Sequence, residues 1–200
     1  TFDDDPLRMM RAVRFAAQLN FKIARDALLS IRKNAARISI VAPERTVQEF
    51  NKILCVAKPS YGLGLLFTSG LLEQILPELC ALQGVEEVEG QLHKDNFYHT
   101  LEVVDNLSHT SEDLWLRWAA LLHDIGKPRT KKFIKGTGWT FRGHEFLGGK
   151  MVPKLFKRMH LPTDARMKFV IKMVQMSSRP AALSDDAVTA SALRRLLFDA

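Results

Sequence analysis

The chain has 200 residues, of which 46% are hydrophobic and 26% are charged. This balance is typical of a globular protein with a buried core and excludes an intrinsically disordered chain. Charged residues and glycines interrupt every long apolar stretch, so the sequence predicts no membrane span. The acidic start, Thr1-Phe2-Asp3-Asp4-Asp5, is unlike a secretory signal. We therefore expect a cytoplasmic protein.

The chain is basic, with a formal net charge of +7 and an isoelectric point near 9.6. Lys and Arg side chains that neutralise phosphates release counterions, which favours binding of a polyanion. RNA or DNA is the natural partner for such a chain. A basic surface that is only hydrated has the same composition, so charge alone leaves both interpretations open.

The first predicted helix covers residues 5–19. Asp5 is a residue typical of the position before a helix, Pro6 is favoured at the first helical position, and Asn20 is suited to the end. The helix interior is otherwise rich in Leu, Met, Val, Phe and Ala. The sequence therefore predicts an amphipathic helix at the start of the chain.

Three arginines share one side of this helix. At about 100° per residue, Arg8, Arg11 and Arg14 fall within a sector about 120° wide. A cationic stripe beside apolar faces suits an anionic ligand. The purely structural alternative for Asp5 and Arg8 is an ion pair between residues three positions apart.

The run from Asp4 to Phe21 resembles the nucleotide-selecting helix of bacterial tRNA nucleotidyltransferases, the CCA-adding branch of the poly(A) polymerase superfamily. Asp4 matches the first acidic position, where the family usually has Glu, while Asp5 and Arg8 match the two base-reading positions. The resemblance implies that these residues, with Arg11, bind CTP or ATP, because a held Asp–Arg pair offers an acceptor and donors to base edges. Arg11 and Arg14 would then face the triphosphate or a neighbouring domain.

Helical spacing continues over residues 24–36 and 43–57, and two short helices follow over 61–67 and 69–79. The segment 42–50 resembles the neck helix of the same family. Residues 79–96 differ in character, with two glycines and an acidic cluster. We therefore place a domain boundary near Gly84, which gives a nucleotide-selecting and neck region over residues 1–84 and a second domain over residues 85–200.

His123 and Asp124 end an apolar helical run that begins at Leu114, and Gly126 and Pro128 then stop the helix. His99 begins another predicted helix. Packing of the two helices would bring an imidazole from one to the imidazole and carboxylate of the other. Two imidazoles and a carboxylate suit borderline or hard divalent ions. A capping pair and an ordinary half-buried histidine are the structural alternatives.

This pattern resembles the HD superfamily of metal-dependent phosphohydrolases. His99, His123 and Asp124 match its first three ligand positions, and Lys127 matches a lysine often found near the phosphoryl group. His144 matches a histidine often placed at or near the metal. The resemblance implies a metal site formed by His99, His123, Asp124 and His144, with Lys127 as a catalytic group and with Ni²⁺, Mn²⁺ or Mg²⁺ as the ion.

Two departures from the HD pattern are visible. Ser177 and Ser178 stand where related domains often have a histidine, which weakens the expectation of a second metal position. Asp185, Asp186 and Asp199 are poor matches to the last HD aspartate. We therefore expect that aspartate beyond residue 200, in an HD domain whose C-terminal end is missing.

The remaining chain predicts one hairpin and three helices. Residues 131–141 place β-branched and aromatic residues around Gly136-Thr137-Gly138, which indicates a hairpin that either faces RNA or covers the metal site. Helical spacing covers residues 146–160 and 162–176, and a last helix is expected from Thr189. The predicted fold is all-α, with a helical neck region packed against a helical HD domain and one small β-hairpin.

Nucleotidyl transfer requires carboxylates that bind Mg²⁺ and a Gly-rich loop for the triphosphate, and neither precedes Asp5. We therefore expect a fragment of an enzyme that adds CCA, or only C or A, to tRNA 3′ ends with CTP and ATP, its Mg²⁺ site lying in a catalytic head domain. One alternative is a free-standing HD phosphohydrolase acting on nucleotides or cyclic phosphates. Another is a non-catalytic tRNA-binding protein.

Overall fold

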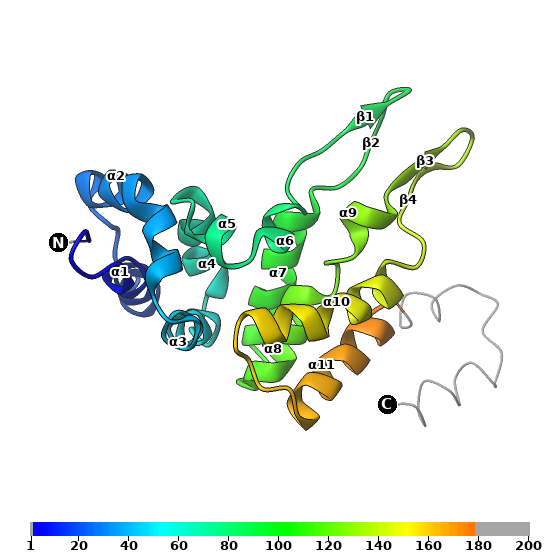
Figure 1. Ribbon diagram of the computed structural model, residues 1–200. Coiled ribbons are helices and arrows are strands. Elements are labelled where there is room, and N and C mark those ends of the chain that lie inside the picture. Colours follow the sequence, from blue (N-terminus) through cyan, green and yellow to red (C-terminus); the bar gives the residue numbers. More distant parts are fainter. Residues whose placement is uncertain (1, 179–200) are drawn as a thin grey trace.

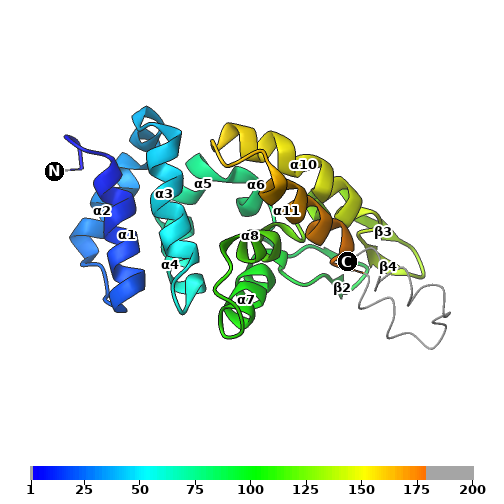
Figure 2. The ribbon, with the colours of Figure 1, turned by 90° about the horizontal axis from the view of Figure 1, so that it is seen from below.

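The structure, a computed structural model that describes residues 2–178, is a row of packed helices with two hairpins projecting from one side (Figure 1). Helices α1 to α3 form one end of the row, and α7 to α11 form the other (Figure 2). None of the helices in the described part is long and apolar enough to cross a membrane. The all-α fold predicted from the sequence is confirmed.

The helices are α1 (Leu7–Leu19), α2 (Arg25–Asn34), the 3₁₀ helix η1 (Ala35–Ile40), α3 (Pro43–Leu54), α4 (Pro59–Thr68), α5 (Leu71–Ile75), α6 (Pro77–Cys80), α7 (Asn96–Ser108), α8 (Leu114–Leu122), α9 (Lys127–Thr130), α10 (His144–Arg158) and α11 (Ala165–Met176). The strands are β1 (Glu87–Val88), β2 (Gln91–Leu92), β3 (Lys132–Ile134) and β4 (Gly138–Thr140). The helix expected from Thr189 lies outside the described residues.

Helix α1 shows how local sequence sets an element's ends. The carboxylate of Asp5 accepts a hydrogen bond from the backbone N–H of Leu7, as a residue before a helix does. Asn20 ends the helix in the left-handed conformation, with φ of 54°. Buried Met9, Met10 and Val13 then pack one face of α1 into the core.

The described residues form two short antiparallel pairs, where the sequence predicted one hairpin. The expected pair, β3 with β4, joins Lys132 to Thr140 and Ile134 to Gly138. The second, β1 with β2, is closed by Glu89 and Gly90, whose φ angles of 51° and 75° are those of a tight hairpin turn. Two-residue strands without alternating hydrophobicity give no sequence signal, which is why this pair was missed.

The two halves of the chain are joined by a buried arginine, Arg117 of α8. Its guanidinium donates to the carbonyl oxygens of Leu54 and Val56, at the end of α3, at 2.9 and 2.8 Å. The indole N–H of Trp118 donates to Asn51 Oδ1 at 2.8 Å. Carbonyl groups at a helix end are costly to bury without hydrogen bonds. Arg117 therefore supplies donors to these carbonyls. Together these hydrogen bonds hold α8 against α3.

The two hairpins lie side by side on the same side of the molecule (Figure 1). The indole N–H of Trp139 in β4 donates to the carbonyl oxygen of Gln91 in β2 at 2.9 Å. The ring of buried His93 meets the Trp139 ring edge-on, with 4.9 Å between the ring centroids. Because a short hairpin is marginally stable alone, this mutual support explains how both are held.

Candidate metal centre

Two helix ends position the candidate ligands. Asp95 caps α7 by accepting hydrogen bonds from the backbone N–H groups of Phe97 and Tyr98, which starts the helix three residues before His99. His99 therefore lies in the first turn of α7. Helix α8 ends at Leu122, so His123 and Asp124 follow at its carboxyl end. The helix predicted to begin at His99 begins earlier because the cap at Asp95 fixes its start.

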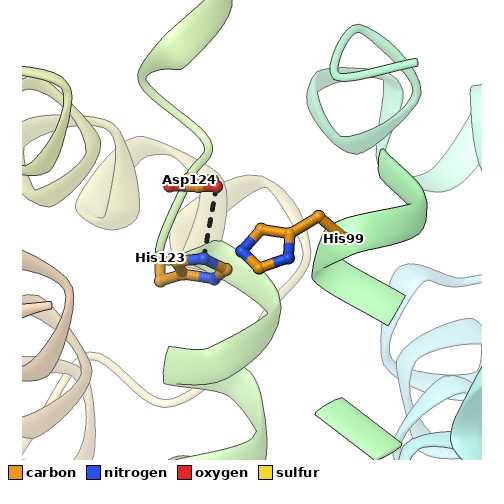
Figure 3. A group of neighbouring side chains, drawn as sticks. All are labelled: His99, His123 and Asp124. Carbon is orange, nitrogen blue, oxygen red and sulfur yellow. Dashed lines mark ion pairs between the residues drawn. The ribbon is translucent and has the colours of Figure 1, made fainter. Parts of the chain in front are cut away.

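His99, His123 and Asp124 come together, as the sequence predicted. One ligand atom from each lies within 4.8 Å of the others. Figure 3 shows the two imidazoles turned toward a common space, with the carboxylate beside it. His123 Nε2 lies 3.2 Å from Asp124 Oδ2, and the two imidazole centroids are 5.8 Å apart. This spacing allows the three side chains to contact one ion.

The backbone sets which nitrogen of His123 faces the site. His123 Nδ1 lies 2.7 Å from the carbonyl oxygen of Ala120. A carbonyl only accepts hydrogen bonds, so Nδ1 carries the proton. In the neutral ring Nε2 then keeps its lone pair, and Nε2 is the atom beside Asp124. Metal-binding histidines are commonly oriented in this way.

Asp124 is the most deeply buried of the three, with 2% of its surface exposed. Burial raises the pKa of Asp124, but neighbouring His123, His144 and Lys127 outweigh it and hold this pKa far below its usual range. Oδ2 accepts no well-aligned hydrogen bond within the described chain, although cationic groups lie beside it. A buried, ionised carboxylate next to two imidazoles fits a divalent cation.

Lys127 does not stand free in front of the metal position. Its Nζ lies 2.7 Å from Asp124 Oδ2 and donates to Asn96 Oδ1 at 3.2 Å. It also lies 5.3 Å from the centroid of the Phe141 ring. The ammonium therefore balances the charge of Asp124. Asn96, buried in the first turn of α7, is a contributor that sequence reasoning missed, because no pattern singles out one amide.

His144 contacts the other oxygen of Asp124. Its Nε2 lies 3.3 Å from Oδ1, and its Nδ1 donates to the carbonyl oxygen of Phe141 at 2.8 Å. The hydrogen bond to Asp124 raises the pKa of His144. His144 lies outside the three-residue group that shares the ion position. The structure thus brings His144 to the site through Asp124.

Gly126 makes this approach possible. A Cβ at Gly126 would lie 2.2 Å from the carbonyl oxygen of His144, far inside van der Waals contact. The start of α10 can therefore reach Asp124 only where residue 126 has no side chain. The sequence predicted a helix stop at this position, and the tertiary packing adds the requirement for close approach.

Lys94 is a second contributor that the sequence did not indicate. Its Nζ lies 3.1 Å from His99 Nδ1, and because an ammonium only donates, this nitrogen holds a lone pair. Burial lowers the pKa of His99 and favours its neutral form. A metal ion that binds His99 must therefore displace either the Lys94 ammonium or the proton on Nε2.

Helix α1, at whose start the predicted nucleotide-binding residues lie, is at one end of the row of helices, apart from α7 and α8, which carry the candidate metal ligands (Figure 1). Asp4, Arg8 and Arg11 are exposed, and Asp5 is half-buried. Arg8 Nε lies 3.8 Å from Asp5 Oδ2. Arg14 differs, because it turns inward to Glu49 of α3.

Ser177, one of the two serines that depart from the HD pattern, directly follows α11. Its Oγ donates to the carbonyl oxygen of Val174 at 2.8 Å. Asp185, Asp186 and Asp199 lie outside the described residues.

Two family models match the chain. One, described as the probable RNA- and SrmB-binding site of polymerase A, matches residues 20–82. The other, described as the HD domain, matches residues 96–192. The two matches follow one another along the chain, the first on the neck region and the second on the helices that carry the candidate metal centre.

Curated relatives match both regions together. An A-adding tRNA nucleotidyltransferase of Deinococcus radiodurans is 35% identical over 192 residues, which cover 92% of this chain and 43% of the relative. A multifunctional CCA protein of Herminiimonas arsenicoxydans is 36% identical over 171 residues, or 82% of this chain and 40% of the relative. A multifunctional CCA protein of Vibrio campbellii is 35% identical over 82% of this chain and 41% of the relative.

The chain thus spans about two fifths of the length of these relatives. The two matched regions follow one another in the same order as the two regions predicted from the sequence. The chain therefore carries a segment that matches the probable RNA- and SrmB-binding site of polymerase A, followed by an HD domain, and over both regions it is similar to part of the tRNA nucleotidyltransferase and CCA proteins named above.

Proposed function

We propose that this protein takes part in adding CCA, or only its C or A residues, to the 3′ ends of tRNA, with CTP and ATP as substrates. The observation that carries the proposal is the alignment of 92% of the chain with an A-adding tRNA nucleotidyltransferase. Because the chain spans 43% of that relative, the reaction is assigned to the whole protein. The Mg²⁺ ions of the transfer reaction would be held outside these 200 residues.

Asp4, Asp5, Arg8 and Arg11 are proposed to bind the incoming nucleotide. Arg8 supports this role through its exposure, since 56% of its side-chain surface is open to solvent. A guanidinium near a carboxylate can present donors and an acceptor to the edge of a base.

We further propose residues 1–84 and 85–200 as the two domains, and the cytoplasm as their location.

Nucleotide incorporation tests this function. The full-length protein that contains this sequence is incubated with tRNA lacking its 3′ CCA and with labelled CTP, ATP or both. We expect incorporation of C, A or CCA, and the products distinguish the three activities. If neither nucleotide is incorporated, this function is rejected and the alternative of a free-standing HD phosphohydrolase gains weight.

We propose a second activity for the HD domain, hydrolysis of a phosphoester. The observation that favours it is the group formed by His99, His123 and Asp124, in which a buried, ionised carboxylate lies beside two imidazoles. These three residues would hold Ni²⁺, Mn²⁺ or Mg²⁺. The ion, when bound, would polarise a phosphoryl oxygen and supply a water of lowered pKa.

The surrounding residues have distinct proposed tasks. His144 orients Asp124 through Oδ1, and it is the candidate fourth ligand. Lys127, which pairs with Oδ2 in the structure, is proposed to contact the phosphoryl group when one binds at the metal position. The Ala120 carbonyl fixes the ring of His123. This part of the proposal is tested by metal analysis and by hydrolysis of a phosphomonoester and a 2′,3′-cyclic phosphate with each ion in turn.

A further inference from the structure

Helix α10 exposes four side chains along one face. Phe146, Lys150, Lys154 and Lys157 follow one another at intervals of four, four and three residues, and all four are exposed. At about 100° per residue they fall within a sector about 80° wide. We name these four residues the α10 ridge.

The lysines of the α10 ridge have no carboxylate partner among residues 2–178. Lys150 Nζ lies 4.3 Å from the centroid of the Phe146 ring. The neighbouring Arg158, by contrast, makes two hydrogen bonds to the carboxylate of Glu78, at 2.5 and 2.7 Å. The fold therefore neutralises Arg158 but leaves the charge of the α10 ridge uncompensated.

The α10 ridge connects two parts of the molecule already described. Helix α10 begins at His144, which contacts Asp124 of the candidate metal centre. Just beyond its other end, His160 Nδ1 lies 2.7 Å from Glu44 Oε1, in the first turn of α3. Figure 2 shows α10 running from the neck helices toward the β3–β4 hairpin. A 15-residue helix is about 22 Å long, so the ridge covers most of this path.

We propose that the α10 ridge binds the phosphate backbone of RNA and leads a strand from the neck region to the candidate metal centre. This inference rests on the proposed function for the identity of the polyanion. Lys150 and Lys154 are separated by a rise of about 6 Å, comparable with the spacing of phosphates along a strand. Phe146, with 57% of its surface exposed, lies at the metal end and offers a stacking face to an unpaired base.

RNA fits this surface better than a membrane or an acidic protein does. Membrane-surface helices combine basic residues with a broad apolar face, whereas Phe146 is the single large apolar side chain of the α10 ridge. An acidic protein would require no connection to a phosphoester site. A helix face that runs toward the end of α10 at which His144 contacts Asp124 suits a ligand whose end is chemically processed.

The test measures RNA binding by the intact protein as a function of salt. The probe is a tRNA acceptor-stem duplex with a single-stranded 3′ end, and the variant combines Lys150→Gln, Lys154→Gln and Lys157→Gln. We expect at least a tenfold loss of affinity at about 0.1 M salt and a salt slope shallower by about 2 to 3, because up to three phosphate contacts are lost. The matched control, the same three positions changed to Arg, should retain both affinity and slope.

A second variant locates the end of the strand. Phe146→Ala should weaken binding of the duplex with the 3′ overhang but leave binding of a blunt duplex unchanged, because stacking requires unpaired bases. All four side chains are exposed, so thermal unfolding should be unaffected in each variant. Equal losses for both duplexes would contradict the assignment of Phe146 to a base.

The outcomes separate this inference from the proposed function. Wild-type affinity and salt slope in the Gln variant would overturn the proposal that the α10 ridge binds RNA. Incorporation of CTP and ATP by the same preparation would still support the proposed function. RNA binding that depends on the α10 ridge, without incorporation of either nucleotide, would reject nucleotide addition and support the role of the ridge. Binding to anionic vesicles but not to RNA would show that the ridge contacts a membrane surface, and it would overturn the proposal.

Discussion

Arg14 Nε of α1 donates to Glu49 Oε2 of α3 at 2.5 Å, in a contact that is largely buried. Lys52 adds a second hydrogen bond to the same carboxylate at 3.1 Å. Arg14 shares its helix with Arg8 and Arg11, yet it fastens two helices together while the other two face solvent. We therefore assign Arg14 to packing rather than to nucleotide binding.

The ion pair predicts a pH-dependent contribution to stability. Burial raises the pKa of Glu49, but hydrogen bonds from Lys52 and Arg14 outweigh it, so the pKa in the folded protein lies below the ordinary 4.5. The contribution is therefore complete above that value and is lost as the pH falls from it through the lowered folded pKa. Glu49→Gln should cost about 2 kcal/mol at neutral pH, because Arg14 loses its buried partner.

Urea unfolding of wild type and Glu49→Gln at about pH 7 and about pH 3 measures this effect. We expect the difference between the two proteins to shrink at the lower pH. Glu112→Gln, at an exposed position on the surface, should match the wild type throughout. A difference that stays constant over this range would show that the carboxylate charge of Glu49 is not the stabilising feature.

Gly126→Ala should damage the candidate metal centre. The added Cβ would lie 2.2 Å from the carbonyl oxygen of His144, so the start of α10 must move away from Asp124. We expect a loss of at least about 2 kcal/mol in the free energy of unfolding and weaker metal binding. Thermal unfolding with and without added Mn²⁺ provides both measurements.

Gly64 supplies the matched control for this substitution. It lies within α4, and a Cβ there would meet nothing within 4 Å. Gly64→Ala should therefore stabilise the protein by about 0.5 to 1 kcal/mol, because alanine is the better helix former. If Gly126→Ala behaves like Gly64→Ala, the close approach of His144 is not needed for the fold.

Asp124→Ala should abolish metal-dependent phosphoester hydrolysis by the full-length protein while sparing nucleotide addition. The substitution removes the buried oxygen ligand and leaves only imidazoles at the ion position, which hold a hard cation poorly. Metal content and hydrolysis are measured on the same preparation. Hydrolysis at the wild-type rate would mean that this group supports the structure and does no chemistry.

Arg8→Ala should impair discrimination of CTP and ATP against GTP and UTP by at least tenfold. The side chain is exposed, so the change in unfolding free energy should stay within about 0.5 kcal/mol. Arg25→Ala, at the exposed start of α2, is the control. Nucleotide selection that is unchanged in Arg8→Ala would reject the base-reading role of this residue.

The sequence predicted the helices well where local signals were strong. Asp5 and Asn20 predicted the two ends of the first helix closely. Capping and the left-handed conformation depend on residues that are near in the chain. The grouping of His99 with His123 and Asp124 also followed from the sequence. Both histidines lie at ends of helices whose apolar faces pack together, and helical periodicity reveals those faces.

Only the tertiary structure decided which of several residues with equivalent sequence positions is buried in a contact and which stays exposed. Periodicity places Arg8, Arg11 and Arg14 in one sector, but α3 packs against one edge of it, so Arg14 meets Glu49 while Arg8 stays exposed. The sequence likewise gave no sign that Asn96 and Lys94 contact Lys127 and His99. Contacts between side chains on different elements depend on how those elements pack, which leaves no periodic trace in the chain.

The two roles of Gly126 show the same division. Its position after His123 and Asp124 predicts the end of a helix from the sequence alone. It must also lack a Cβ, so that the backbone of His144 can lie against residue 126 while the imidazole reaches Asp124. This requirement follows from α10 returning to this point eighteen positions later in the chain. The local conformation was determined by neighbours in the sequence, whereas the steric requirement exists only because two distant segments occupy the same space.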